Sequence, residues 1–115
     1  MPANCLPLSD LTRTAERTVK RVEGKDLGTE LTILTFTSTE IGDGPVLHVH
    51  TYDEVFLIHE GSARFTVGDQ EIIAEAGQVV LGPANVPHKF ENLGSGRLTT
   101  TDIHLSNHFE QVNLE

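Results

Sequence analysis

The chain has little of what several classes of protein need. It contains no tryptophan, one tyrosine and five phenylalanines in 115 residues, so few rings are available for nucleic-acid bases to stack on. Basic residues are also scarce, because eight Lys and Arg stand against 17 Asp and Glu and the formal net charge is −9. Since affinity for nucleic acid depends largely on clustered Lys and Arg, this composition argues against a nucleic-acid partner.

Long apolar runs and paired cysteines are missing as well. No stretch approaches the roughly 18 consecutive apolar residues of a membrane span. The first ten residues have neither the basic nor the apolar region of a signal peptide. Cys5 is the only cysteine, with no helix signal or neighbouring histidine, so we interpret it as a free thiol on an N-terminal arm. We expect a soluble, cytoplasmic protein with no membrane contact, formed by a single domain over 1–115 with an arm over 1–17.

Ten glycines punctuate short runs rich in Thr, Val, Ile and Leu, a pattern typical of a sandwich or barrel of short strands. The clearest unit is Ser62–Ala74, where two alternating runs flank Gly68-Asp69 and predict a type II′ hairpin. Only Ser9–Arg17 has weak helical character. The further predicted strands are Thr18–Val22, Glu30–Ser38, Val46–His50, Glu54–Glu60, Gln78–Leu81, His88–Asn92 and Arg97–Leu105. The predicted fold class is all-β.

Two of the six histidines, His48 and His50, lie two positions apart. Residues i and i+2 of a strand point to the same face, so both imidazoles would converge in front of the sheet. Glu54 has the same parity and joins them if the strand resumes after Asp53. Two imidazoles and a carboxylate suit Zn, Fe, Mn, Ni or Cu better than Ca or Mg. The alternative at this point is a chance pair of histidines on an exposed strand face.

The wider spacing resembles the two signatures of the cupin family. Gly42, five residues, His48-Val49-His50, three residues, Glu54, six residues and Gly61 match the first motif, over 42–61. Gly77, five residues, Pro83-Ala84-Asn85, two residues, His88, three residues and Asn92 match the second, over 77–92. Asn85 departs from the glycine of the pattern, but Asn tolerates a left-handed backbone best among the other residues. The 15 residues between the motifs are similar in number to those of compact single-domain members.

The resemblance implies a single conical jelly-roll-like β-barrel with one divalent metal ion, Fe, Mn, Ni or Zn. Its ligands would be His48, His50, Glu54 and His88, while Asn92 would be structural. A four-coordinate zinc ion would be closed to substrate. An ion that prefers six ligands would keep two positions open for a small molecule, or for a small molecule beside O₂.

Strand parity also predicts which face of the sheet the neighbouring side chains point to. Phe56 and Ile58 share the face of Glu54 and are expected to line an apolar pocket, whereas His59 points away. Asp102 and His104 alternate with Ile103 and Leu105, and we favour a solvated strand face for them over an acid–base pair in the cavity. His108 receives no role. The outer strip of Val55, Leu57 and His59 predicts a homodimer, because exposed apolar edges are ordinarily covered.

Three functional hypotheses follow from these residues. The first is a metal-dependent enzyme acting on a small molecule in the barrel, with a dioxygenase-like reaction first and an isomerase or decarboxylase next. The second is a metal or small-ligand binding or sensor module without turnover. The third, a purely structural barrel, leaves the ligand set without a purpose. A metallo-β-lactamase-like hydrolase is excluded because His50 is followed by Thr51-Tyr52-Asp53-Glu54 and not by that family's HxHxDH pattern.

Overall fold

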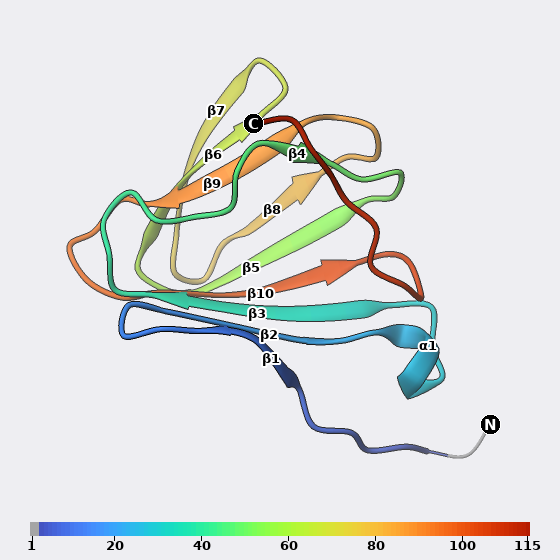
Figure 1. Ribbon diagram of the computed structural model, residues 1–115. Helices are drawn as coiled ribbons and strands as arrows, with labels where there is room; N and C mark the ends of the chain where they lie inside the picture. Colours follow the sequence, from blue (N-terminus) through green and yellow to red (C-terminus); the bar gives the residue numbers. More distant parts are fainter. Residues whose placement is uncertain (1–2) are drawn as a thin grey trace.

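A computed structural model describes residues 3–115, which form two antiparallel sheets of a jelly-roll sandwich (Figure 1). Six strands form one sheet in the order β1-β2-β3-β10-β5-β8, and five form the other in the order β11-β4-β9-β6-β7. The elements of the first sheet are β1 (Ser9–Arg13), β2 (Arg17–Val22), β3 (Thr32–Ser38), β5 (Glu54–Glu60), β8 (Val79–Gly82) and β10 (Leu98–His104). Those of the second are β4 (His48–Val49), β6 (Ser62–Val67), β7 (Gln70–Glu75), β9 (His88–Asn92) and β11 (Val112–Asn113).

The strands bury alternate residues, as a sheet with one face on a core requires. In β5 and β10 the buried positions recur every second residue. Phe56, Phe65 and Phe90 come together between the sheets with ring centroids 4.9 to 5.7 Å apart. In Figure 1 the sheets converge on one side and diverge on the other, where the red C-terminal segment crosses the opening. The all-β jelly-roll prediction is therefore confirmed.

Two turns have the backbone that the sequence predicted. Gly68 has φ +59° and Asp69 has no positive φ, so the β6–β7 hairpin closes with a type II′ turn. Asn85, which stands where the second cupin motif has glycine, has φ +64°. An asparagine therefore supplies the left-handed turn that leads into β9.

The weak helical prediction for Ser9–Arg17 is wrong. Ser9–Arg13 is strand β1, which pairs with β2 and brings Ser9 opposite Arg21. The segment has little amphipathic character to stabilise an isolated helix, whereas β2 offers it a free edge to pair with. The single helix in residues 3–115, α1 (Gly24–Leu27), has only four residues, far fewer than a bilayer-spanning helix needs.

Candidate metal centre

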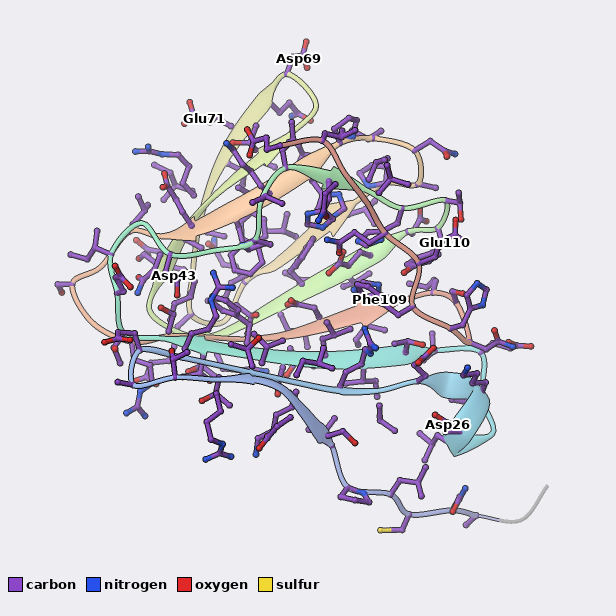
Figure 2. The ribbon with its side chains drawn as sticks, viewed as in Figure 1. Asp26, Asp43, Asp69, Glu71, Phe109 and Glu110 are labelled. Carbon is purple, nitrogen blue, oxygen red and sulfur yellow. The ribbon has the colours of Figure 1, made fainter. Side chains whose placement is uncertain are left out.

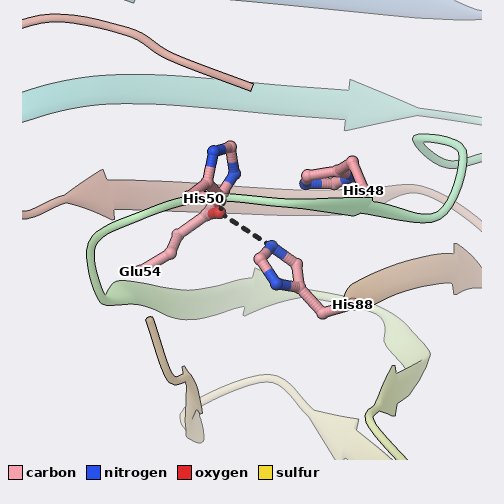
Figure 3. Close-up of side chains that lie close together, drawn as sticks. All are labelled: His48, His50, Glu54 and His88. Atoms are coloured by element: carbon pink, nitrogen blue, oxygen red, sulfur yellow. Dashed lines mark hydrogen bonds and ion pairs between the residues drawn. The ribbon is translucent and has the colours of Figure 1, made fainter. Parts of the chain in front are cut away.

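The pairing of the strands brings the four motif residues to one place inside the sandwich (Figure 3). His48 in β4 lies opposite His88 at the start of β9, in the five-stranded sheet. Glu54 begins β5 in the six-stranded sheet and faces them, while His50 follows β4 directly. One ligand atom from each of these four side chains lies within 4.8 Å of all the others, and all four residues are buried. The predicted strand His88–Asn92 coincides with β9, whereas the predicted strand Val46–His50 is reduced to the two residues of β4.

Each of the three imidazoles is oriented by a backbone carbonyl that accepts a hydrogen bond from Nδ1. The carbonyls are those of Val46 for His48, Glu110 for His50 and Val86 for His88, at 2.6, 2.6 and 3.2 Å. A carbonyl oxygen can only accept, so Nδ1 carries the proton in all three rings. A neutral imidazole then presents the lone pair of Nε2, which is the tautomer a metal ligand needs.

The three imidazoles converge on the Glu54 carboxylate. Nε2 of His50 and Nε2 of His88 each lie 3.0 Å from Oε1 of Glu54. Nε2 of His88 is in hydrogen-bonding geometry with Oε1 of Glu54, whereas Nε2 of His50 has no hydrogen-bond partner although it is fully buried. Lone pairs turned toward a carboxylate repel it unless a cation lies between them. One divalent cation satisfies this donor set, and three buried imidazolium rings would do so only at a high cost in desolvation.

Burial sets the charge states at the centre. It lowers the pKa of His48 to about 4, only partly opposed by the Val46 carbonyl, so this imidazole is neutral at physiological pH. Burial alone would raise the pKa of Glu54, but hydrogen bonds from His104, His50 and His88 hold that pKa well below its usual range when their Nε2 atoms carry protons, and a metal ion would take the place of those protons. His48 therefore offers a neutral nitrogen donor and Glu54 an anionic oxygen donor, a combination preferred by Mn, Fe, Ni and Zn.

A fifth residue, His104 on β10, completes the surroundings of Glu54. β10 pairs with β5 so that His104 lies opposite Glu54, and its Nε2 is 3.0 Å from Oε2 of Glu54. Nδ1 of His104 lies 2.7 Å from the Tyr52 hydroxyl. That hydroxyl also donates to the Glu110 carbonyl at 3.0 Å, and burial raises the pKa of Tyr52 to about 12. His104 thus lies at Oε2 of Glu54, and Oε1 is left to His50 and His88.

The prediction of a solvated face for Asp102 and His104 is wrong. Their side chains are 6% and 2% exposed and point between the sheets, while Ile103 faces outward. Asp102 and His104 share the parity of Leu98, which is completely buried at the other end of β10. Leu98 points to the inner face and Ile103 to the outer one, so the sequence of β10 offers both orientations, and the register with β5 decides between them.

The C-terminal segment, residues 105–115, lies across the open side of the sandwich (Figure 2). The Phe109 ring lies beside those of His50 and His104, with centroids 6.1 and 5.5 Å away. Glu110 contributes its backbone carbonyl to His50 and to Tyr52. Strand β11 then pairs with β4, with Asn113 opposite His48. Sequence reasoning missed Phe109 and Glu110, and it placed His108, which is exposed, in a segment without a role.

A cavity of about 200 Å³ adjoins the centre between the two sheets. Phe56 lines it as predicted, whereas Ile58 packs deeper in the hydrophobic core and does not. His59 is exposed on the outer face, where its Nε2 lies 2.7 Å from Oγ1 of Thr101, as its parity predicts. The cavity is lined by Leu11, Thr12, Arg17, Val19, Leu34, Phe36, Pro45, His48, Glu54, Phe56, Phe90, Asp102, His104, Phe109 and Gln111.

Asn92, the last residue of the second motif, is structural. Its Nδ2 donates to the carbonyls of Ser38 and Gly96 at 3.3 and 3.0 Å, and its Oδ1 accepts from the Gly94 amide at 2.8 Å. Gly82 serves the centre more directly, because a Cβ there would lie 3.2 Å from the Phe56 ring and 3.4 Å from Nδ1 of His88. The absence of a side chain at Gly82 leaves room for the Phe56 ring, which packs against the His88 imidazole with centroids 5.6 Å apart.

Comparisons with known proteins agree with this architecture. The uncharacterised protein MJ1618 of Methanocaldococcus jannaschii is 32% identical over 56 residues, which are 48% of this chain and 45% of that protein. Among solved structures, oxalate decarboxylase of Bacillus subtilis, studied for its Mn(II) centres, superimposes with a TM-score of 0.81 at 23% identity. That match covers 92% of this chain and 30% of the decarboxylase chain.

A second structure of the Bacillus subtilis oxalate decarboxylase, at pH 4.6, gives a TM-score of 0.79 at 24% identity and covers 89% of this chain and 28% of the other. At these identities the likeness concerns the fold, and the chain spans less than half the length of each of these relatives. The family model of the cupin domain matches residues 36–104, which include both motifs and β10. With its fold, its two motifs and this match over more than half of its residues, the chain belongs to the cupin family.

Proposed function

We propose that this protein binds one divalent metal ion through His48, His50, Glu54 and His88 and acts as a metal-dependent enzyme on a small molecule in the adjoining cavity. The observation that carries the proposal is the convergence of four buried ligand atoms within 4.8 Å of one another, with each of the three imidazoles fixed by a backbone carbonyl at Nδ1. Such anchoring is the usual support of metal-ligating histidines.

A bound ion would act as a Lewis acid on a chelating substrate, and a redox-active ion would also allow oxygen chemistry. The chain's own residues exclude water and hold the donors in place. Phe109 and Gln111 cover the cavity from the C-terminal segment, and Phe36, Phe56 and Phe90 form an apolar wall. Two titratable residues that are not metal ligands in the proposal, Asp102 and His104, also face the cavity.

These two residues favour an enzyme over a binding module without turnover. A reaction on a chelated small molecule ordinarily needs a group that holds or moves a proton, and the sandwich places two such groups beside the centre. A dioxygenase-like reaction stays the first choice, with isomerisation or decarboxylation next, and the identity of the ion separates them. Iron supports oxygen chemistry, and a closed zinc site supports a structural or binding role.

The test is metal analysis of protein purified anaerobically without a metal-affinity column. We expect about one ion per chain in the wild type and an at least tenfold loss of bound metal in His48→Ala, His50→Ala and His88→Ala. The exposed His59→Ala is the matched control and is expected to keep its metal. A wild type that binds none of Fe, Mn, Ni or Zn would refute the proposal. Loss of metal in His59→Ala but not in His88→Ala would refute the assignment of the ligands.

We also propose that the chain forms a homodimer through the outer face of the six-stranded sheet. β8 is an edge strand, and its Val79 and Leu81 are 63% and 52% exposed. They lie beside the half-buried Leu57 and Val55 of β5 and form a row without charged residues. A second copy of the same apolar row is its best complement, since apolar area drives association. Light scattering at micromolar concentration is expected to give twice 12.6 kDa. A monomer mass would refute the dimer.

A further inference from the structure

Asp102 is a buried carboxyl group that the proposed metal site does not use. It lies in the middle of β10, between Leu34 of β3 and Phe56 of β5, and is 6% exposed. Its Oδ1 accepts a hydrogen bond from Oγ1 of Thr100 at 2.8 Å. Within residues 3–115 no other hydrogen bond or ion pair reaches this carboxyl, whose side chain lines the cavity. Its second oxygen is therefore left for something in the cavity.

The charged groups around the cavity give Asp102 no cationic partner. Arg17 of β2 is held by the carboxylate of Asp43 and by the Gly44 carbonyl. From β10, His104 is directed at Glu54, and His48 of β4 is directed at the metal centre. β3 adds no titratable group to the lining, and neither does the C-terminal segment.

The remaining neighbour is an anion, the Glu54 carboxylate on β5. A carboxyl group taken out of water without a cation is stable only when it keeps its proton. Burial is the main cause that raises the pKa of Asp102 well above its usual range, and burial remains when a metal ion offsets the charge of Glu54, which adds to the shift; the hydroxyl of Thr100 opposes it.

We propose that Asp102 recognises the small molecule in the cavity, because its protonated carboxyl donates a hydrogen bond from its second oxygen to an oxygen atom of that molecule. The walls of Val19, Leu34, Phe36, Phe56 and Phe90 select a compact apolar skeleton. The molecule is thus a bidentate oxygen chelator with a small apolar body, since the metal centre lies at the same cavity. This inference extends the proposed function. It depends on that function only for the end of the small molecule that chelates the metal ion.

Tropolone, a compact apolar ring with two adjacent oxygen donors, is a suitable probe. Its affinity for the Mn(II)-loaded protein at pH 7 is compared by calorimetry in the wild type, Asp102→Asn, Asp102→Leu and Thr101→Val. Asp102→Leu fills the same space without a donor and is expected to bind at least tenfold more weakly, the effect of one hydrogen bond of about 1.4 kcal/mol. Asp102→Asn keeps a donor and is expected within about threefold of the wild type.

Thr101→Val, on the opposite face of β10, is the matched control and should bind as the wild type does. Bound metal and thermal unfolding are measured for each variant, so a folding defect is recognised. Equal affinity in Asp102→Leu and the wild type would overturn the inference. Asp102→Asn binding as weakly as Asp102→Leu would also overturn it, because an ionised carboxylate would then be the acting form.

A second measurement does not depend on metal. At pH 7 the infrared spectrum of the wild type is expected to contain the carbonyl band of a protonated carboxylic acid. The band should disappear in Asp102→Asn and persist in Asp43→Asn, because Arg17 and Ser38 lower the pKa of Asp43 and keep it ionised. A wild type without this band would overturn the inference. A wild type with the band but without bound metal would refute the proposed function and leave the protonated Asp102 intact.

Discussion

Removing the Glu110 carbonyl from His50 is the most direct test of how the C-terminal segment supports the metal centre. A side-chain substitution cannot remove a backbone carbonyl, so two truncations are compared. A chain ending at Gln111 loses β11 and its pairing with β4 but keeps the Glu110 carbonyl 2.6 Å from Nδ1 of His50. A chain ending at Asn107 loses that carbonyl and Phe109 as well.

The expected difference follows from the role of the second partner of a metal-bound imidazole. Losing such a partner typically lowers metal affinity 10- to 100-fold, or about 1.4 to 2.7 kcal/mol. The shorter chain should therefore bind Zn(II) 10- to 100-fold more weakly than the chain ending at Gln111. The full-length protein should lie close to the latter, since β11 contacts the centre only through the backbone pairing of β4.

Competition with a chromophoric chelator at pH 7.5 measures both dissociation constants, and each truncated protein must first show a cooperative thermal transition. The ratio of the two constants is the decisive quantity, because both variants lack β11. A ratio below about threefold would mean that water replaces the carbonyl without loss. That result would refute the argument that residues 108–111 hold His50 in its ligating tautomer.

Three further predictions concern side chains around the centre. His104→Leu should lower Zn(II) affinity 10- to 100-fold because Oε2 of Glu54 loses its partner. His104→Gln keeps a donor and should lose less affinity. Equal losses of affinity in a chelator competition would contradict this. Gly82→Ala should weaken Zn(II) binding in the same assay by displacing the Phe56 ring that packs against His88, whereas Gly77→Ala, whose Cβ meets nothing within 4 Å but whose φ is +91°, should reduce stability alone. Folded Asp102 keeps its proton at pH values where the unfolded chain has lost it, so its contribution to stability falls as pH rises above about 4. Urea unfolding between pH 4 and 8 should therefore show Asp102→Asn gaining stability relative to the wild type, and a pH-independent difference would contradict the raised pKa.

The metal-ligand candidates were within reach of sequence reasoning because their geometry is local. A spacing of two places His48 and His50 on one face, and a fixed turn before β9 sets the position of His88. Asn85 was equally readable, since few residues other than glycine accept a positive φ. The shared face of His48 and His50 needs only the residue types and the local backbone, whereas the roles of His88 and Asn85 were expected from the resemblance to the second cupin motif.

Orientation relative to the core was harder to predict. Alternation in β10 says that Asp102 and His104 share a face, but it does not say which face is inside. The apolar Ile103 favoured the wrong choice, and the answer came from the register with β5, which sets His104 opposite Glu54. Glu110 has no signature at all, because it acts through a carbonyl that every residue possesses.

The distribution of the ligands between the two layers has a mechanical consequence. Glu54 belongs to the six-stranded sheet, whereas His48 and His88 belong to the five-stranded one, so an ion held by all of them would cross-link the layers. With one cysteine the chain cannot form such a tie covalently. Separation of the sheets would then require metal–ligand bonds to break. Local opening of the structure would therefore be slower where β4 and β9 of one sheet face β5 and β10 of the other. Amide exchange in these strands would become slower on metal loading, while β1 at the far edge would exchange as before.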